Sequence, residues 1–225
     1  IAVIGVSSSG SSTLSAKFIK SGANDFLNKP FLREEFFCRV AMNVDMLEQV
    51  DALKAAATTD YLTGIPNRRS FFERAKPLMA AAARGADVAA ALIDLDHFKS
   101  INDSFGHAAG DQVLVETAAE LRRCFRREDM IFRIGGEEFL ILAPGLSAAA
   151  MATRLQAARR GLAANPVLAK RLNGRRVQFS AGLAQWHPQQ DELQEVILAA
   201  DGRLYQAKRE GRNRTVGGEA REGAA

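Results

Sequence analysis

Two acidic residues close an apolar segment in the middle of the chain. A strand is expected at Ala89–Leu95, and Asp94 and Asp96 stand at its end. A strand among apolar neighbours does not end in two carboxylates unless their charges meet a partner, because an unpaired buried charge is costly. Mg²⁺ in proteins is commonly held by one or two carboxylates together with substrate phosphates. The pattern predicts a metal ligand at Asp94, whereas capping of a helix that begins near His97 accounts for Asp96 but hardly for Asp94.

Another pair of carboxylates follows a glycine pair between two short apolar strands, in the run Gly135-Gly136-Glu137-Glu138. One interpretation is a hairpin whose glycines supply positive φ and whose acids are merely solvated. The other is that this hairpin lies beside the strand that ends at Asp94, which would gather several carboxylates around one metal ion. A tight glycine turn would also let a phosphate approach the backbone closely.

Polar residues between these two motifs could recognise a nucleotide. Lys99 follows the strand end closely enough to reach a phosphate, and Asn102 and Asp111 flank a turn at Gly106. A carboxylate accepts two hydrogen bonds and therefore suits guanine, whose N1–H and N2–H₂ donors adenine lacks. Taken singly, each of these residues would be an ordinary exposed or capping position.

The elements that must position these residues follow from the spacing of the apolar residues. Strands are expected at residues 1–8, 24–28, 89–95, 131–134, 139–142 and 177–184. Helices are expected at about residues 13–21 and 32–59, in the segment that ends near 84, between 96 and 125, and at 148–163 and 193–210. Helices interleaved with strands, including one tight hairpin, indicate an α+β fold whose central sheet is flanked by helices.

The helix expected at residues 32–59 is much longer than the mean helix of about 11–12 residues. Its apolar residues recur at three- and four-residue steps, at Phe36, Val40, Val44, Leu47, Val50 and Leu53. Such a helix either packs against its own domain or acts as a coiled-coil connector that pairs two chains. Asp51 and Lys54 interrupt any single apolar seam.

The chain has 225 residues, of which 47% are hydrophobic and 25% are charged, so it is neither disordered, collagen-like nor a disulfide scaffold. The length predicts one full domain with an appendage, or two small domains. Cys38 and Cys124 lie far apart without metal-type spacing, which favours a reducing cytosol. Residues 1–6 are read as a strand rather than a signal peptide, and no window approaches the roughly 20 apolar residues of a membrane span. We therefore expect a cytoplasmic protein without a membrane partner. The formal charge of +4 permits an anionic ligand but does not predict a nucleic-acid partner.

Four separated motifs together resemble the GGDEF diguanylate cyclase family, in its GGEEF form. The motifs are Asp60–Arg69, Asp94–Asp111, Gly135–Phe139 and Ala200–Asn213. The resemblance covers about residues 58–217 in the family's order and spacing, and leaves residues 218–225 as a flexible tail. It implies a fold like the palm of class III nucleotide cyclases and polymerases. It also implies that the chain condenses two GTP molecules into cyclic di-GMP with release of pyrophosphate.

The resemblance implies a role for individual residues as well. Asp94, the carbonyl of Leu95 and Glu137 would ligate Mg²⁺, or Mn²⁺ in its place, and Glu137 would also take the proton from the attacking 3′-hydroxyl. Lys99 would stabilise charge on the phosphates. The other implied substrate contacts are Asn102 and Asp111 to guanine, His107 to the substrate, and Lys208 and Arg212 to the phosphates. Metal-bridged phosphates and cationic side chains suit an in-line displacement at the α-phosphate.

Arg126 and Asp129 precede the glycine pair by a short interval, in the RxxD pattern of the family's inhibitory site. The resemblance implies that these two residues bind the product, cyclic di-GMP, and inhibit the enzyme. The alternative is a solvated, charged helix end. An accessory arginine that the family often carries in the following helix aligns with Ala157, with Arg159 and Arg160 close by.

Residues 1–35 resemble the C-terminal part of a two-component receiver domain, and residues 36–57 would form the connector helix. In that domain Ser7 would be the switch hydroxyl, Lys29 the phosphate-contacting lysine, and the Lys29–Pro30 bond a cis peptide. The phosphoacceptor aspartate of a receiver belongs to earlier strands. The chain as given is therefore not expected to be phospho-activated.

Two functions remain open at this point. In the first, each cyclase domain holds one GTP, and two domains must meet in a homodimer for the reaction to occur. In the second, the chain is a catalytically silent receptor that binds cyclic di-GMP through Arg126 and Asp129 and acts through protein contacts. The acids Asp94 and Glu137, together with Lys99, favour the enzyme, because a receptor would need none of them.

Overall fold

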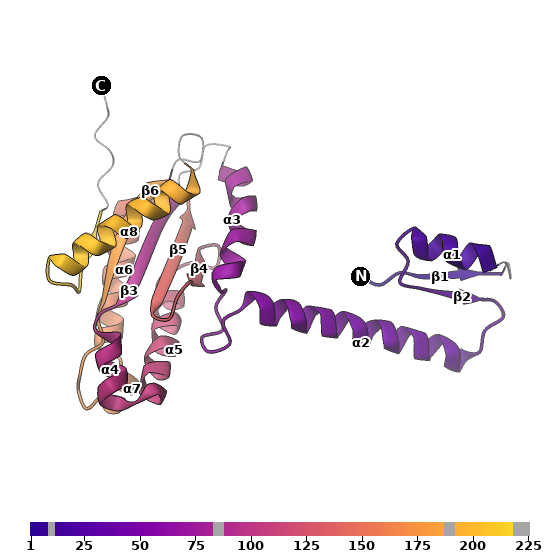
Figure 1. The fold of residues 1–225 in the computed structure, drawn as a ribbon, viewed down its shortest axis with the longest axis horizontal. Helices are drawn as coiled ribbons and strands as arrows, with labels where there is room; N and C mark the ends of the chain where they lie inside the picture. The colour runs from indigo at the N-terminus through magenta and orange to yellow at the C-terminus, as the bar shows by residue number, and fades with distance from the viewer. Residues whose placement is uncertain (9–11, 83–87, 187–191, 218–225) are drawn as a thin grey trace, which may run out of the picture. The chain divides into compact units, whose positions relative to one another are not determined.

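The computed structural model describes residues 1–8, 12–82, 88–186 and 192–217. The chain divides into two compact units, Ile1–Ala57 and Thr58–Ala225 (Figure 1). The tail expected at residues 218–225 lies outside the described residues. No helix in the described ranges is long and apolar enough to cross a membrane.

The first unit is a small α/β element followed by a long helix. Its elements are β1 (Ile4–Ser7), α1 (Ser12–Lys20), β2 (Asp25–Asn28) and α2 (Arg33–Thr58). β1 and β2 pair in parallel, and Phe26 and Leu27 of β2 are buried. The ring of Phe18 lies against Phe26 with 5.3 Å between centroids. The Lys29–Pro30 bond is cis, which confirms that prediction.

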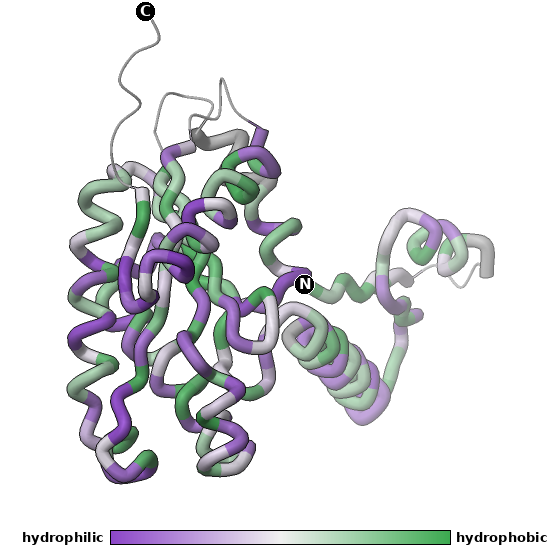
Figure 2. Tube along the Cα trace, turned by 60° about the vertical axis from the view of Figure 1, so that its left-hand side comes forward, coloured by the Kyte–Doolittle hydropathy of each residue, from purple (hydrophilic) through white to green (hydrophobic). Residues whose placement is uncertain are grey.

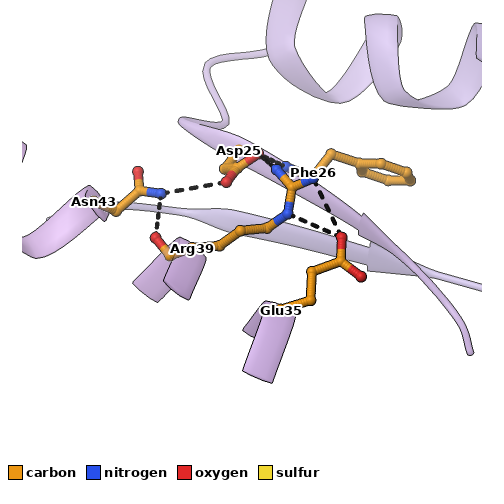
Figure 3. Close-up of polar contacts among 5 residues, drawn as sticks. All are labelled: Asp25, Phe26, Glu35, Arg39 and Asn43. Atoms are coloured by element: carbon orange, nitrogen blue, oxygen red, sulfur yellow. Dashed lines mark hydrogen bonds and ion pairs between the residues drawn. The ribbon is translucent and has the colours of Figure 1, made fainter. Parts of the chain in front are cut away.

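A polar network attaches the first turns of α2 to β2 (Figure 3). Arg39 donates from Nη1 to Asp25 Oδ1 at 2.8 Å and from Nε to Glu35 at 3.3 Å. Asn43 donates to the other oxygen of Asp25 at 3.5 Å. Burial raises the pKa of Asp25, but the hydrogen bonds from the Phe26 N–H and from Arg39 outweigh it, so that the pKa lies below its ordinary value. The network fixes how the long helix leaves the strand.

The expected helix at residues 32–59 is confirmed as α2, which has 26 residues. Much of its apolar surface stays exposed, because Phe37, Met42, Met46 and Leu53 are each more than half exposed. Figure 2 shows hydrophilic and hydrophobic residues mixed along this helix. Exposure of this kind favours a connector over a helix that is packed along its whole length against its own unit.

The second unit is built on a five-stranded mixed sheet with the strand order β4-β5-β3-β6-β7. Its strands are β3 (Val88–Leu95), β4 (Met130–Arg133), β5 (Glu138–Pro144), β6 (Phe179–Trp186) and β7 (Thr215–Val216). Neighbouring strands are antiparallel except for β6 and β7, which are parallel. The fold class is the α+β architecture expected from the sequence.

Helices cover both faces of this sheet. They are α3 (Arg68–Ala82), α4 (Phe98–Phe105), α5 (His107–Cys124), α6 (Ala148–Ala163), α7 (Pro166–Arg171) and α8 (Leu193–Arg209). One core cluster joins one face of the sheet to α4, α5, α6 and α7, and the other joins the opposite face to α3 and α8. Alternation along β3 produces the two faces: Ala89, Ala91 and Ile93 enter the first cluster, and Val88, Ala90 and Leu92 enter the second.

Three details differ from the sequence-based expectations. The short helix α7 and the two-residue strand β7 were not expected, because neither has enough residues to show a hydrophobic period. The strand expected at residues 177–184 lies at Phe179–Trp186. The hairpin between β4 and β5 is present, but neither Gly135 nor Gly136 has a φ between +20° and +160°, so the positive-φ interpretation of the glycine pair is wrong.

Candidate active site

The alternation of side chains along β3 decides which helix lies beside Asp94. Its side chain shares the face of Val88, Ala90 and Leu92, which is the face that α8 covers. Asp94 is only 7% exposed. A carboxylate so deeply placed in an apolar layer must have a charged or hydrogen-bonding partner.

That partner comes from the last turn of α8. Lys208 Nζ lies 2.8 Å from Asp94 Oδ2. The helix can come this close to the sheet because β6 carries Gly182, where a Cβ would collide with the backbone of Ala200 and Leu204. The glycine therefore provides the space in which the cation of α8 reaches the acid of β3.

Glu137 in the hairpin turn lies beside the same strand end. The Leu95 N–H donates to the Glu137 carbonyl at 3.3 Å. Burial and then the charge of Asp94 raise the pKa of the Glu137 carboxyl above its ordinary value, while Lys208 acts in the opposite direction. The structure thus brings together Asp94, Leu95, Glu137 and Lys208, four of the residues selected from the sequence.

An ion pair that was not expected holds the hairpin turn in place. Arg133 donates to the Gly136 carbonyl at 2.7 Å and to both carboxylate oxygens of Asp60 at 2.9 and 3.1 Å. Asp60 also accepts from the hydroxyl of Thr63 at 2.6 Å. Burial raises the pKa of Asp60, but the hydrogen bonds from Thr63 and Arg133 outweigh it and lower the pKa below its ordinary value. Both side chains are largely buried, so the turn is fixed by a paired and shielded arginine.

The predicted guanine readers flank a turn as expected. Gly106 joins α4 to α5 with φ +81° and has open space around it. Asn102 Oδ1 is buried and has no hydrogen-bond partner, and a Cβ at Gly110 would collide with it. Asp111, next in sequence to that glycine, is exposed. An orphaned buried acceptor beside an exposed carboxylate is a site that can receive N–H donors from a ligand.

Asp96 does not cap α4, so the alternative of a capping role does not hold for this residue. The N-cap of α4 is His97, and no side chain caps it. The Asp96 carboxylate instead accepts from the Ser180 hydroxyl at 2.8 Å and from the Asn213 N–H at 2.9 Å. It connects β3 to β6 and to the turn after α8.

The remaining predicted substrate contacts have exposed side chains. Lys99 lies in the first turn of α4, His107 begins α5, and Arg212 lies in the turn after α8. In the part of the chain that the structure describes, none of these three side chains is bonded to Asp94 or Glu137. Among the same described residues, no group of three or more His, Cys, Asp or Glu side chains is arranged to hold a metal ion.

Most of the chain matches one known protein family. Residues 57–214 match the family described as "Diguanylate cyclase, GGDEF domain". The chain belongs to this family.

Two curated relatives show how much of a longer protein the chain represents. The chain is 44% identical over 160 residues to the diguanylate cyclase DgcP of Pseudomonas aeruginosa, and this alignment covers 70% of the chain and 23% of DgcP. It is 35% identical over 212 residues to the response regulator PleD of Caulobacter vibrioides, and this alignment covers 89% of the chain and 46% of PleD. The chain thus spans a quarter to a half of the length of these relatives.

A solved structure of the GGDEF family supports the fold. The coiled coil and GGDEF domain of DgcB from Caulobacter crescentus, in complex with c-di-GMP, superposes with a TM-score of 0.72 and 30% sequence identity. The match covers 81% of this chain and 97% of that chain. The fold of the second unit is therefore that of a GGDEF domain.

The RxxD residues of this GGDEF domain lie in a turn after α5 rather than on a helix end. The Arg126 guanidinium is exposed, but Asp129 is 8% exposed and accepts from the Arg126 backbone N–H at 2.7 Å and from Arg154 Nη1 at 2.8 Å. The alternative of a solvated helix end is therefore wrong for Asp129. Arg154 was missed by the sequence reasoning. It lies one helical turn before Ala157 on α6, and this three-residue spacing on one helix face is the signal that could have found it.

Proposed function

We propose that the chain is a diguanylate cyclase, which joins two GTP molecules into cyclic di-GMP and releases two pyrophosphates. The observation that carries this proposal is the meeting of Asp94, Glu137 and Lys208 at one end of the sheet, in a chain of the GGDEF family. A buried acid and a half-buried acid that repel one another beside a cation are an arrangement that a pure receptor does not require. Relatives such as DgcP and DgcM carry the name of this enzyme.

Asp94, the Leu95 carbonyl and Glu137 are the groups proposed to hold Mg²⁺, or Mn²⁺ in its place. The electrostatics fit a divalent cation, because the pKa of Glu137 is raised by burial and by the charge of Asp94. With two carboxylates at hand, the rest of the coordination would come from phosphate oxygens and the backbone. Such an ion neutralises charge on the phosphates and orients them.

Glu137 is the proposed base. It takes the proton from the 3′-hydroxyl of one GTP as that oxygen forms a bond to the α-phosphorus of the other GTP. The bond between that phosphorus and the bridging oxygen of the β-phosphate breaks, and pyrophosphate leaves. A second, equivalent step closes the ring. Lys99, Lys208 and Arg212 are proposed to stabilise the charge that develops on the phosphates.

Asn102 and Asp111 are proposed to select guanine, with His107 as a further substrate contact. The orphaned Oδ1 of Asn102 supports this, since a buried acceptor is expected to find a donor when the site is filled. Guanine offers N1–H and N2–H₂ to Asp111 and Asn102, whereas adenine presents an acceptor at N1. Gly110 supports the assignment too, because any larger residue would displace the amide.

The active form is proposed to be a homodimer in which two GGDEF domains face each other, each with one GTP. The exposed apolar residues of α2 support a connector that pairs two chains. The solved DgcB relative contains a coiled coil next to its GGDEF domain.

Product inhibition is proposed at the turn that carries Arg126 and Asp129. Arg126 is exposed and able to present its guanidinium fork to O6 and N7 of a guanine. Arg154 supplies a second guanidinium, held by the buried carboxylate of Asp129. The complex of the DgcB relative with c-di-GMP supports binding of this nucleotide by the family fold.

The first 35 residues are proposed to be the C-terminal part of a receiver domain, with Ser7 and Lys29 in its switch positions. Their parallel β1–α1–β2 arrangement supports this. The similarity to the response regulator PleD covers 89% of this chain, and so extends beyond the GGDEF domain.

The purified chain, incubated with GTP and Mg²⁺ and analysed by chromatography, tests the proposed activity. We expect cyclic di-GMP and pyrophosphate in a ratio of one to two. If the chain binds cyclic di-GMP but does not turn over GTP, the proposed cyclase activity is wrong and the chain is a cyclic di-GMP receptor.

A further inference from the structure

Asp96 is a buried carboxylate that the proposed chemistry does not use. It is 5% exposed and lies two residues beyond Asp94. Its two oxygens accept from different elements: Oδ1 from the Ser180 hydroxyl on β6, and Oδ2 from the Asn213 backbone N–H. A carboxylate that receives one hydrogen bond on each oxygen is fixed in orientation, and charge-assisted bonds of this kind are stronger than neutral ones.

The turn held by Asp96 has an unfavourable backbone. Gly211, Arg212 and Asn213 have φ values of +109°, +63° and +47°. Two consecutive residues with a Cβ in the left-handed region are uncommon, and such conformations persist only where the surroundings impose them.

Three contacts impose this conformation. The Arg212 N–H donates to the Ala207 carbonyl at 3.0 Å, which closes the end of α8. The Arg214 carbonyl accepts from the Ala181 N–H at 2.9 Å, which starts the pairing of β7 with β6. Between them, the Asn213 N–H is bound by Asp96. The contact from Asp96 connects the turn to the end of β3, where the proposed metal ligands Asp94 and Leu95 lie.

A cation accompanies the buried charge of Asp96. Arg159 of α6 is half-buried, and its guanidinium lies over the ring of Phe179 at 5.9 Å. Burial lowers the pKa of Arg159, and the charge of Asp96 acts against this lowering. The negative charge beneath the turn is thus partly balanced from the opposite side of the sheet.

We propose that Asp96 is a positioning residue, which fixes the turn carrying Arg212 and so places that guanidinium for the phosphates of GTP. The inference rests on the proposed function, because Arg212 is a phosphate contact only if GTP is the substrate. Asp94 and Asp96 then have separate tasks: the first would hold the proposed metal ion, and the second fixes the turn that carries Arg212.

The test is a double-mutant cycle on nucleotide binding. The probe is guanosine 5′-(α,β-methylene)triphosphate, which lacks the bond that the proposed reaction breaks. Its affinity is measured by calorimetry in Mg²⁺ for the full chain and for Asp96→Ala, Arg212→Ala and the double variant. We expect Asp96→Ala to weaken binding about tenfold in the parent chain and less than about twofold in Arg212→Ala, because its effect passes through Arg212.

Ser180→Ala is the matched control. It removes a hydrogen bond from the same carboxylate but leaves the bond from the Asn213 N–H. We therefore expect Ser180→Ala to weaken binding of the analogue less than about threefold, while its loss of thermal stability is similar to that of Asp96→Ala. Asp96→Leu, which likewise offers no acceptor to the Asn213 N–H, replaces Asp96→Ala in the cycle if the alanine variant does not fold.

Equal weakening by the Asp96 substitution in both Arg212 backgrounds would overturn the proposal. So would a Ser180→Ala effect as large as that of Asp96→Ala. A parent chain that binds the analogue but forms no cyclic di-GMP from GTP would remove the proposed function while leaving this cycle decisive.

Discussion

Lys208 Nζ lies 2.8 Å from Asp94 Oδ2, so that the end of α8 is joined by an ion pair to the end of β3. The lysine side chain is 33% exposed and that of the acid 9%, which places the pair at the boundary between the core and solvent. A cation at this boundary can serve the buried acid and an incoming phosphate in turn. The position of α8 against the sheet, and hence Gly182 beneath it, therefore helps to set the geometry of the proposed active site.

The first prediction concerns the choice of base. ATP should be turned over at least about 100-fold more slowly than GTP, because its adenine would leave Asn102 and Asp111 without donors. Initial rates of pyrophosphate release with the two nucleotides measure this. Comparable rates would remove both residues from base recognition.

The second prediction concerns the product. Arg126→Ala and Arg154→Ala should each weaken cyclic di-GMP binding about tenfold in calorimetry and relieve inhibition, because each loses a guanidinium. Arg126→Ala should spare the uninhibited rate, and inhibition in the parent chain should be non-competitive with GTP. Arg171→Ala, which removes an exposed arginine on α7, is the control and should bind as the parent does. Parent-like affinity in Arg154→Ala would show that this residue only supports Asp129.

The third prediction uses the lowered pKa of Asp60. A carboxyl whose folded-state pKa lies below its unfolded value of about 3.9 contributes stability above that pH and loses it as the pH falls through the folded pKa. Asp60→Asn should therefore cost about 2 kcal/mol at pH 7, and the cost should shrink below about pH 4. Thermal unfolding between about pH 3 and pH 7 measures this cost. Asp103→Asn, which removes an exposed carboxylate, is the control. A cost that does not change with pH would mean that the charge of Asp60 does not matter.

The fourth prediction concerns assembly. Activity per chain should rise with protein concentration, and charged substitutions at Val44, Leu47 and Val50 of α2 should abolish it, because two half-sites must meet. Sedimentation and rate measurements on the same samples test both parts. Constant specific activity in a demonstrated monomer would rule out the dimer.

The parts of the site that depend on local sequence could be predicted, and the parts that depend on register could not. The alternating and continuous apolar runs identify β3 and the hairpin, and the acids at their ends follow directly. The bond from Arg133 to Asp60 joins residues 73 positions apart, and it needs the alignment of Asn67 with Arg133 at the edge of the sheet. Nothing in either local segment indicates that alignment.

Asp96 shows the same limit in another form. From the sequence, a carboxylate just before a helix is most simply a cap. In the fold, the parallel pairing of β6 with β7 brings Asn213 to within 2.9 Å of it, although 117 residues separate the two in sequence. The expected proximity of Asp94 and Glu137 needed only the neighbouring hairpin, which is why it could be predicted from the sequence, whereas the Leu95 carbonyl came from the family resemblance.

The most direct test of the account is the turnover of GTP by Glu137→Gln in Mg²⁺, with Glu195→Gln, an exposed acid on α8, as the control. An amide is a poor Mg²⁺ ligand and cannot act as a base, so Glu137→Gln should form no detectable cyclic di-GMP while unfolding at the same temperature as the parent. Glu195→Gln should keep the parent rate. Parent-like formation of cyclic di-GMP by the folded Glu137→Gln variant would contradict the assignment of the active site.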